Sequence, residues 1–72
     1  MWIFTKDYAV NTDNVMTMSL DDEYIIFSNP KLSNSTSIHC GSSSGAAYVF
    51  KDIISELGKG TLIFNVDRRL NK

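Results

Sequence analysis

The only histidine and the only cysteine of the chain, His39 and Cys40, are adjacent in the stretch SIHCGSSSGAAYVF, residues 37–50. A cysteine nucleophile needs a base within hydrogen-bond reach. Residues 35–40 alternate in polarity, which predicts a strand whose neighbouring side chains point to opposite faces. We therefore expect no Cys–His dyad, and Cys40 as a small buried hydrophobic residue. The alternative is a reactive thiol, if the strand ends at His39 and Cys40 lies near a helix N-terminus.

The next loop, GSSSG (Gly41–Gly45), has the residue types of an anion site. Free N–H groups at a helix start, and the hydroxyls of Ser42, Ser43 and Ser44, can hold a phosphate or a carboxylate. Tyr48, near the first turn and off the apolar stripe of the helix, would add a stacking surface. The spacing fits neither GxxxxGK[ST] nor GxGxxG. The other interpretation is an ordinary helix start with Ser43 or Ser44 as the N-cap.

The remaining polar clusters indicate turns. Asp21, Asp22 and Glu23 are neighbours in the acidic turn of a hairpin, with no pocket to separate their pKa values. Asn11–Asn14 lacks the glycine and the distant glutamate of a calcium loop. The chain has no CxxC or Cys/His cluster for zinc. We therefore expect no catalytic residues, no metal site and no cofactor.

Composition limits the classes of function. The chain has 72 residues, seven basic and eight acidic, and a net charge of −1. We expect a single domain over residues 1–72 and disfavour nucleic acid as a partner, because no strong positive field attracts phosphates. One cysteine forms no disulfide within the chain, and no basic leader or long apolar run is present, so we expect a cytoplasmic protein without a membrane span.

Hydrophobic periodicity predicts an α+β fold. Residues 46–57 carry apolar side chains at helical spacing, which predicts one amphipathic helix over about 45–57, with Gly58 as a left-handed C′ residue. Alternation of period two predicts strands elsewhere. The expected result is an antiparallel sheet of about five strands, formed by a meander of four, the helix and a final strand, with the helix packed on one face. The predicted final strand covers 61–67, and 68–72 is expected to be a frayed tail.

One helix covers only one face of such a sheet. The other face would carry apolar side chains from Trp2 or Ile3, Ile25 or Ile26, Tyr24 and Ile63. A small monomer rarely leaves that much apolar area in water, so we expect this face to be buried in a homodimer. The final strand would be an edge that pairs across a two-fold axis, and Arg68 after it could meet an acidic partner. The predicted interface residues are Trp2, Tyr24, Ile63 and Arg68.

The opening MWIFTKDYAVNTDNV, followed by strands and an amphipathic helix, resembles small uncharacterised proteins of Gram-positive bacteria and their phages. In these, a WI.T.DG..VN..NV beginning leads into a strand meander and a helix; here Tyr8 replaces the usual turn glycine. The resemblance brings no catalytic residues and implies a protein that acts by binding.

The expected function is that of a non-enzymatic homodimer that occupies a protein partner or sequesters a small ligand. A phage-encoded inhibitor of a host defence system is one concrete form. The alternative is an anion- or nucleotide-binding module that uses Gly41–Gly45.

Overall fold

The computed structural model describes residues 1–70, apart from the side chains of Leu32 and Asn34, and has the predicted α+β class. The strands are β1 (Trp2–Phe4), β2 (Ala9–Asn11), β3 (Thr17–Asp21), β4 (Tyr24–Asn29), β5 (Asn34–His39) and β6 (Ile63–Asn65). The helices are α1 (Ser43–Gly58) and α2 (Val66–Leu70), and short 3₁₀ turns cover Thr12–Asn14 and Pro30–Leu32.

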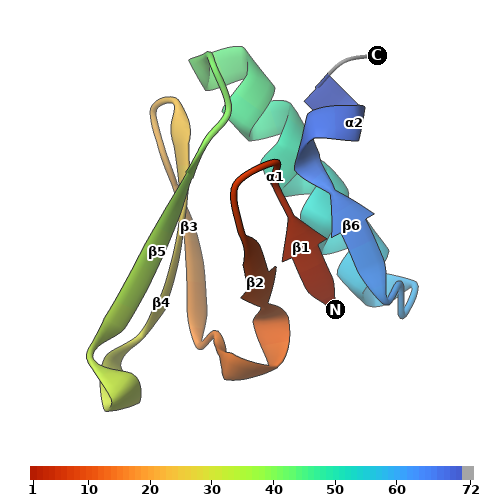
Figure 1. The fold of residues 1–72 in the computed structure, drawn as a ribbon. Coiled ribbons are helices and arrows are strands. Elements are labelled where there is room, and N and C mark those ends of the chain that lie inside the picture. Colours follow the sequence, from red (N-terminus) through yellow and green to blue (C-terminus); the bar gives the residue numbers. More distant parts are fainter. Residues whose placement is uncertain (71–72) are drawn as a thin grey trace.

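The strands form two sheets of three, not the single sheet of about five that the sequence predicted (Figure 1). Sheet B, in the order β3–β4–β5, is antiparallel throughout. Sheet A has the order β2–β1–β6, and β6 runs parallel to β1. The prediction was wrong because the 3₁₀ turn after β2, capped by the side chain of Asn11, separates the first hairpin from β3. The chain then returns through α1, and a helical crossover allows parallel pairing.

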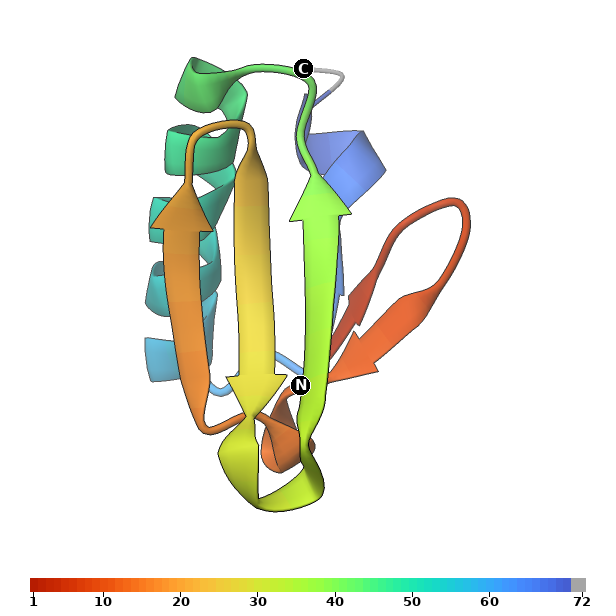
Figure 2. The same ribbon diagram turned by 90° about the vertical axis from the view of Figure 1, so that its left-hand side faces the viewer.

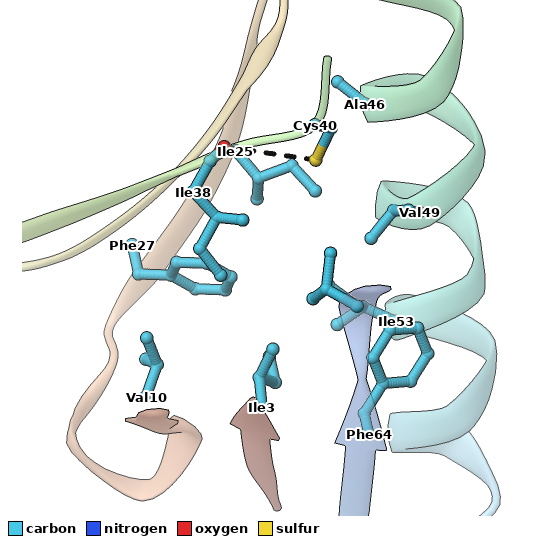
Figure 3. Packing of buried hydrophobic residues seen from close by; sticks show 11 residues of the cluster. Ile3, Val10, Ile25, Phe27, Ile38, Cys40, Ala46, Val49, Ile53 and Phe64 are labelled. Atoms are coloured by element: carbon cyan, nitrogen blue, oxygen red, sulfur yellow. Dashed lines mark hydrogen bonds between the residues drawn. The ribbon is translucent and has the colours of Figure 1, made fainter. Parts of the chain in front are cut away.

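The core lies where the two sheets and α1 face one another (Figure 3). Alternation within the strands directs one residue in two toward it. Ile3 is fully buried, for example, whereas Trp2 and Phe4 on either side of it are exposed. The buried side chains are Ile3, Val10 and Phe64 from sheet A, Ile25, Phe27 and Ile38 from sheet B, and Ala46, Val49 and Ile53 from α1, joined by Cys40 and Val66.

Helix α1 is the element that the sequence predicted best. It begins two residues earlier and ends one residue later than expected. Its N-cap is Ser42, not Ser43 or Ser44. The C-terminal prediction was wrong, because Gly58 is the last helical residue and the left-handed glycine is Gly60, at φ +76°. The chain turns there, since the N–H of Gly60 donates to the Leu57 carbonyl at 3.2 Å.

The segment after β6 is helical, not a frayed tail. The predicted strand 61–67 is shortened to β6, and α2 begins at Val66. Arg69 holds α2 against α1, because its guanidinium forms ion pairs with Asp52 and, at 3.3 Å, with Glu56. The same guanidinium lies 5.0 Å from the centre of the Phe64 ring. Residues 71 and 72 of the predicted tail lie outside the described residues.

Neither helix within residues 1–70 has both the length and the apolar character that crossing a bilayer requires.

Candidate functional site

His39 and Cys40 point to opposite sides of sheet B, as the alternation predicted. The Cys40 side chain is in the core, 5% exposed, with Sγ 4.0 Å from the carbonyl oxygen of Ile38 (Figure 3). The His39 ring is on the outer face, where its Nε2 lies 3.0 Å from Glu23 Oε1 and its centre 4.9 Å from that of the Tyr24 ring. The imidazole and the thiol therefore cannot act together in one chain.

Burial sets the chemistry of the Cys40 thiol. β5 ends at His39, so Cys40 does lie in the segment that leads to α1, as the reactive-thiol alternative required. Burial nevertheless raises the thiol pKa, and the negative charge of Asp67 raises it further. The structure thus contradicts the lowered pKa on which that alternative depended. The thiolate, which is the nucleophilic form, is disfavoured at neutral pH.

Alkylation of Cys40 in the folded protein is expected to be slower than in the urea-unfolded chain, because the raised pKa lowers the thiolate fraction and the side chain is only 5% exposed to the reagent. The pH midpoint of the native reaction should lie above that of a free thiol. Asp67→Asn should move that midpoint down, since it removes the charge that adds to the effect of burial on the pKa. Mass spectrometry of quenched reactions measures the alkylation rates of the folded protein, the unfolded chain and the Asp67→Asn variant. A native rate equal to the unfolded rate would refute this account of the thiol.

The raised pKa of Cys40 also makes the stability of the folded protein depend on pH in the alkaline range. The folded state holds the Cys40 proton more tightly than the unfolded chain. The resulting stability is therefore complete below the ordinary thiol pKa and is lost as the pH rises through the raised value. Tyr8 acts in the same direction, because burial and then the charge of Asp7 raise its pKa.

An open hollow of about 480 Å³ lies beside these residues, between the β1–β2 turn and β5. Tyr8, Tyr24 and Asp67 are among the side chains that line it. The Tyr8 hydroxyl donates a hydrogen bond to the Ser37 carbonyl and so attaches the turn to the free edge of β5. An ordinary tyrosine hydroxyl is protonated at neutral pH, and the raised pKa of Tyr8 keeps this hydroxyl a donor further into the alkaline range.

The loop Gly41–Gly45 forms a tight helix cap. Ser42 Oγ accepts a hydrogen bond from the N–H of Gly45 at 2.9 Å, and the Ser42 carbonyl accepts one from Ala46 at 3.0 Å. Gly41 has φ +83°, a conformation that favours glycine. A Cβ at Gly45 would lie 2.9 Å from the Cys40 carbonyl oxygen, so this glycine is required by a close backbone approach.

The predicted anion site is therefore partly occupied by the cap. Ser43 and Ser44 are exposed, and Ser44 Oγ lies 3.3 Å from Ser42 Oγ. Tyr48, one turn further along α1, is 47% exposed. No contact within the chain tests whether a phosphate or a nucleotide binds here, and the site stays a prediction.

The outer face of sheet A carries a contiguous apolar surface, which we call the sheet A face. It consists of Trp2 and Phe4 of β1 and Ile63 of β6, which are 47%, 37% and 66% exposed. Trp2 pairs with Ile63 across the parallel ladder, and the centres of the Trp2 and Phe4 rings are 6.5 Å apart. Two neutral amides, Asn11 and Asn65, lie beside these residues on the same face.

The structure separates the four predicted interface residues. Trp2 and Ile63 are neighbours on the sheet A face. Tyr24 is on the outer face of sheet B, against His39, and Arg68 is exposed on α2 with its N–H bonded to Asn65 Oδ1 at 2.9 Å. Phe4 was missed, although its spacing of two from Trp2 predicts the same face of a strand.

Neither a family model, nor a curated protein, nor a solved structure matches the chain. Among the surfaces described above, the sheet A face has the residue types that dominate protein interfaces. Tryptophan and other aromatic residues are enriched at such contacts, and charged residues are depleted from their centres. Trp2, Phe4 and Ile63 fit this composition.

Proposed function

We propose that this protein acts by binding, without catalysis, and that the sheet A face is the surface with which it occupies a protein partner. The observation that carries the proposal is the row of exposed apolar side chains at Trp2, Phe4 and Ile63 on a sheet whose other face is already buried in the core. Side chains on this outer face do not contribute to the core of the domain. The apolar composition of the face is therefore better explained by contact with another molecule than by folding.

The size of the sheet A face suits the centre of an interface. Its three apolar side chains together expose on the order of 300 Å², which is at the lower end of the range for the largest and often functional patch of a monomer. A standard interface removes about 800 Å² from each partner, with an apolar centre and a polar rim. The neutral amides of Asn11 and Asn65 are suited to that rim, because burying them costs less than burying charges.

The resemblance of the N-terminal residues to proteins of Gram-positive bacteria and their phages suggests one form of this activity. In that form the protein occupies a component of a host defence system and so inhibits it. Occupation of a partner needs a stable contact surface but no reactive group, which agrees with a thiol that burial keeps protonated.

Trp2→Ser is expected to abolish capture of the partner. The intact chain, Trp2→Ser and Tyr48→Ser are immobilised and exposed to lysate of the cells in which the protein acts, and bound proteins are quantified by mass spectrometry. Tyr48 is the matched control because it is also 47% exposed but lies on α1, away from the sheet A face. Loss of a central aromatic contact costs about 2 kcal/mol or more, which is roughly thirtyfold in affinity.

Trp2 is also the only tryptophan, so its fluorescence reports directly on this face. Addition of the captured partner should shift the emission to shorter wavelength and protect Trp2 from quenching by acrylamide. The proposal is wrong if Trp2→Ser and Tyr48→Ser capture the same proteins equally, or if Trp2 stays as accessible in the complex as in the free protein.

A further inference from the structure

The outer edge of β3 differs from the other sheet edges of the molecule. Within residues 1–70 its only strand neighbour is β4. Edge strands are normally protected by lysine, proline, a bulge or a covering segment, and β3, with the sequence TMSLD, contains neither lysine nor proline. The edge of β5 is contacted by the Tyr8 hydroxyl, and the edge strands of sheet A have only three residues each.

An apolar strip runs beside this edge, formed by Met16, Met18 and Leu20 on one side and Ile54 and Leu57 of α1 on the other. We call it the β3–α1 seam. Met18 packs partly against the core, and the other four side chains are about half exposed. An open hollow of about 340 Å³ lies at one end of the seam. Figure 2 shows α1 behind β3, at this edge of sheet B and away from β5.

Helix α1 carries more apolar side chains than those that pack into the core. The buried side chains of α1 are those of Ala46, Val49 and Ile53, and Phe50 packs partly against the core. Asp52 and Glu56, on one flank of this stripe, hold Arg69 of α2. Successive residues of a helix are turned by about 100°, so Ile54 falls on the opposite flank, toward β3.

We propose that the β3–α1 seam binds the same seam of a second copy of the chain, with the two β3 strands paired antiparallel across a two-fold axis. Ser19 is the middle residue of β3, so a register centred on Ser19 pairs all five residues. It places Met18 opposite Leu20 of the second copy on the core side. On the outer side it places Ser19 opposite Ser19 and Thr17 opposite Asp21 of the second copy, so that a hydroxyl meets a carboxylate and no like charges meet.

The main-chain groups fit the same register. Asp21 and Tyr24 close a two-residue hairpin turn, and such a closing pair is hydrogen-bonded. Because hydrogen-bonded and non-bonded residues alternate along an antiparallel ladder, Met18 and Leu20 direct their N–H and C=O groups away from β4. In the register centred on Ser19 these two residues face each other, and their outward groups become mutual partners.

The two-fold axis is perpendicular to the sheet, so both α1 helices lie on the same side of a continuous six-stranded sheet. Ile54 and Leu57 of each copy are then directed toward the other copy. Four half-exposed side chains and a five-residue edge supply only part of the about 800 Å² of a standard interface. We therefore expect a reversible dimer whose population rises with concentration, and which leaves both sheet A faces exposed.

Sedimentation velocity over a wide range of concentration tests this interface. The unmodified protein should pass from monomer to dimer. Ser19→Lys sets two like charges opposite each other at the axis, on a solvent-exposed position where the folded monomer tolerates lysine. Ile54→Lys replaces an exposed apolar residue by a good helix former. Each variant should weaken dimerisation by about tenfold or more.

Ser37→Lys is the control, because Ser37 is on the same outer face but on the edge strand β5. It should dimerise like the unmodified protein, and acrylamide quenching of Trp2 should not change as dimers form. The proposal is overturned if the unmodified protein is a monomer at every concentration, or if Ser19→Lys and Ile54→Lys dimerise normally. Shielding of Trp2 upon dimerisation would overturn it too, because the interface would then be the sheet A face.

Discussion

Phe64→Ala is expected to leave a chain that is largely unfolded in water. Phe64 is the central residue of β6, is 2% exposed and faces α1 in the core (Figure 3). The Arg69 guanidinium lies over its ring. Replacing such a side chain with alanine costs about 3–5 kcal/mol, through lost burial and the cavity that remains. A core of this size rarely supplies more than about 3–5 kcal/mol in total, so the loss is comparable with the whole stability of the domain.

The matched control is Ile63→Ala, one residue earlier on the same strand. Ile63 is 66% exposed on the sheet A face, so its removal should change the free energy of unfolding by no more than about 1 kcal/mol. Urea denaturation followed by circular dichroism compares the two variants. The description of β6 fails if Phe64→Ala unfolds near the midpoint of the unmodified protein, or if Ile63→Ala is equally damaging.

Gly45→Ala is expected to destabilise the protein by about 1–3 kcal/mol, although alanine is the better helix former. The added Cβ would lie 2.9 Å from the Cys40 carbonyl oxygen and 3.0 Å from Ser42 Oγ. The first of these atoms belongs to the backbone, so the first turn of α1 has to move away from the end of β5. That movement would also disturb the hydrogen bond by which Ser42 caps the helix.

Gly58→Ala makes the same change at the other end of α1. A Cβ there meets no atom within 4 Å, and Gly58 does not have a positive φ. Alanine should therefore stabilise the protein, by up to about 1 kcal/mol, because the unfolded chain loses conformational freedom. Opposite shifts of the urea midpoint are the expected result. A stabilised Gly45→Ala variant would contradict the close approach of α1 to β5.

The elements with strong periodicity could be predicted from the sequence. The apolar spacing of residues 46–57 predicted α1, because a helix with one face in the core repeats its apolar residues about every 3.6 positions. Alternation predicted that His39 and Cys40 occupy opposite faces of their strand. The acidic turn between β3 and β4 was likewise predicted, because polar turn formers separate two apolar runs.

The pairing of the short strands could not be predicted. β1, β2 and β6 have three residues each, too few to show a period, and their partners are set by the path of the chain through α1. The pattern therefore left open whether Trp2 or Ile3 is buried. The helix α2 was missed because its five residues depend on a distant contact, between Arg69 and the carboxylates of Asp52 and Glu56.

The candidate surfaces could be predicted only in part, because they depend on the same strand pairing. The sequence placed Ile63, with Trp2 or Ile3, on the sheet face that the helix does not cover, but the adjacency of Trp2 and Ile63 depends on the parallel pairing of β1 and β6. The free edge of β3 could not be predicted from a pattern that placed every strand in one sheet. Only the division into two sheets leaves β3 at an edge, beside the apolar flank of α1.

Hydrogen–deuterium exchange with mass spectrometry, at rising protein concentration and then with the captured partner, tests most directly whether the molecule has two separate contact surfaces. Concentration alone should increase protection of Thr17–Asp21 and leave Trp2–Phe4 and Ile63–Asn65 unchanged. Addition of the partner should then protect Trp2–Phe4 and Ile63–Asn65. Protection of β3 by the partner, protection of sheet A by concentration, or no concentration-dependent protection would contradict the account.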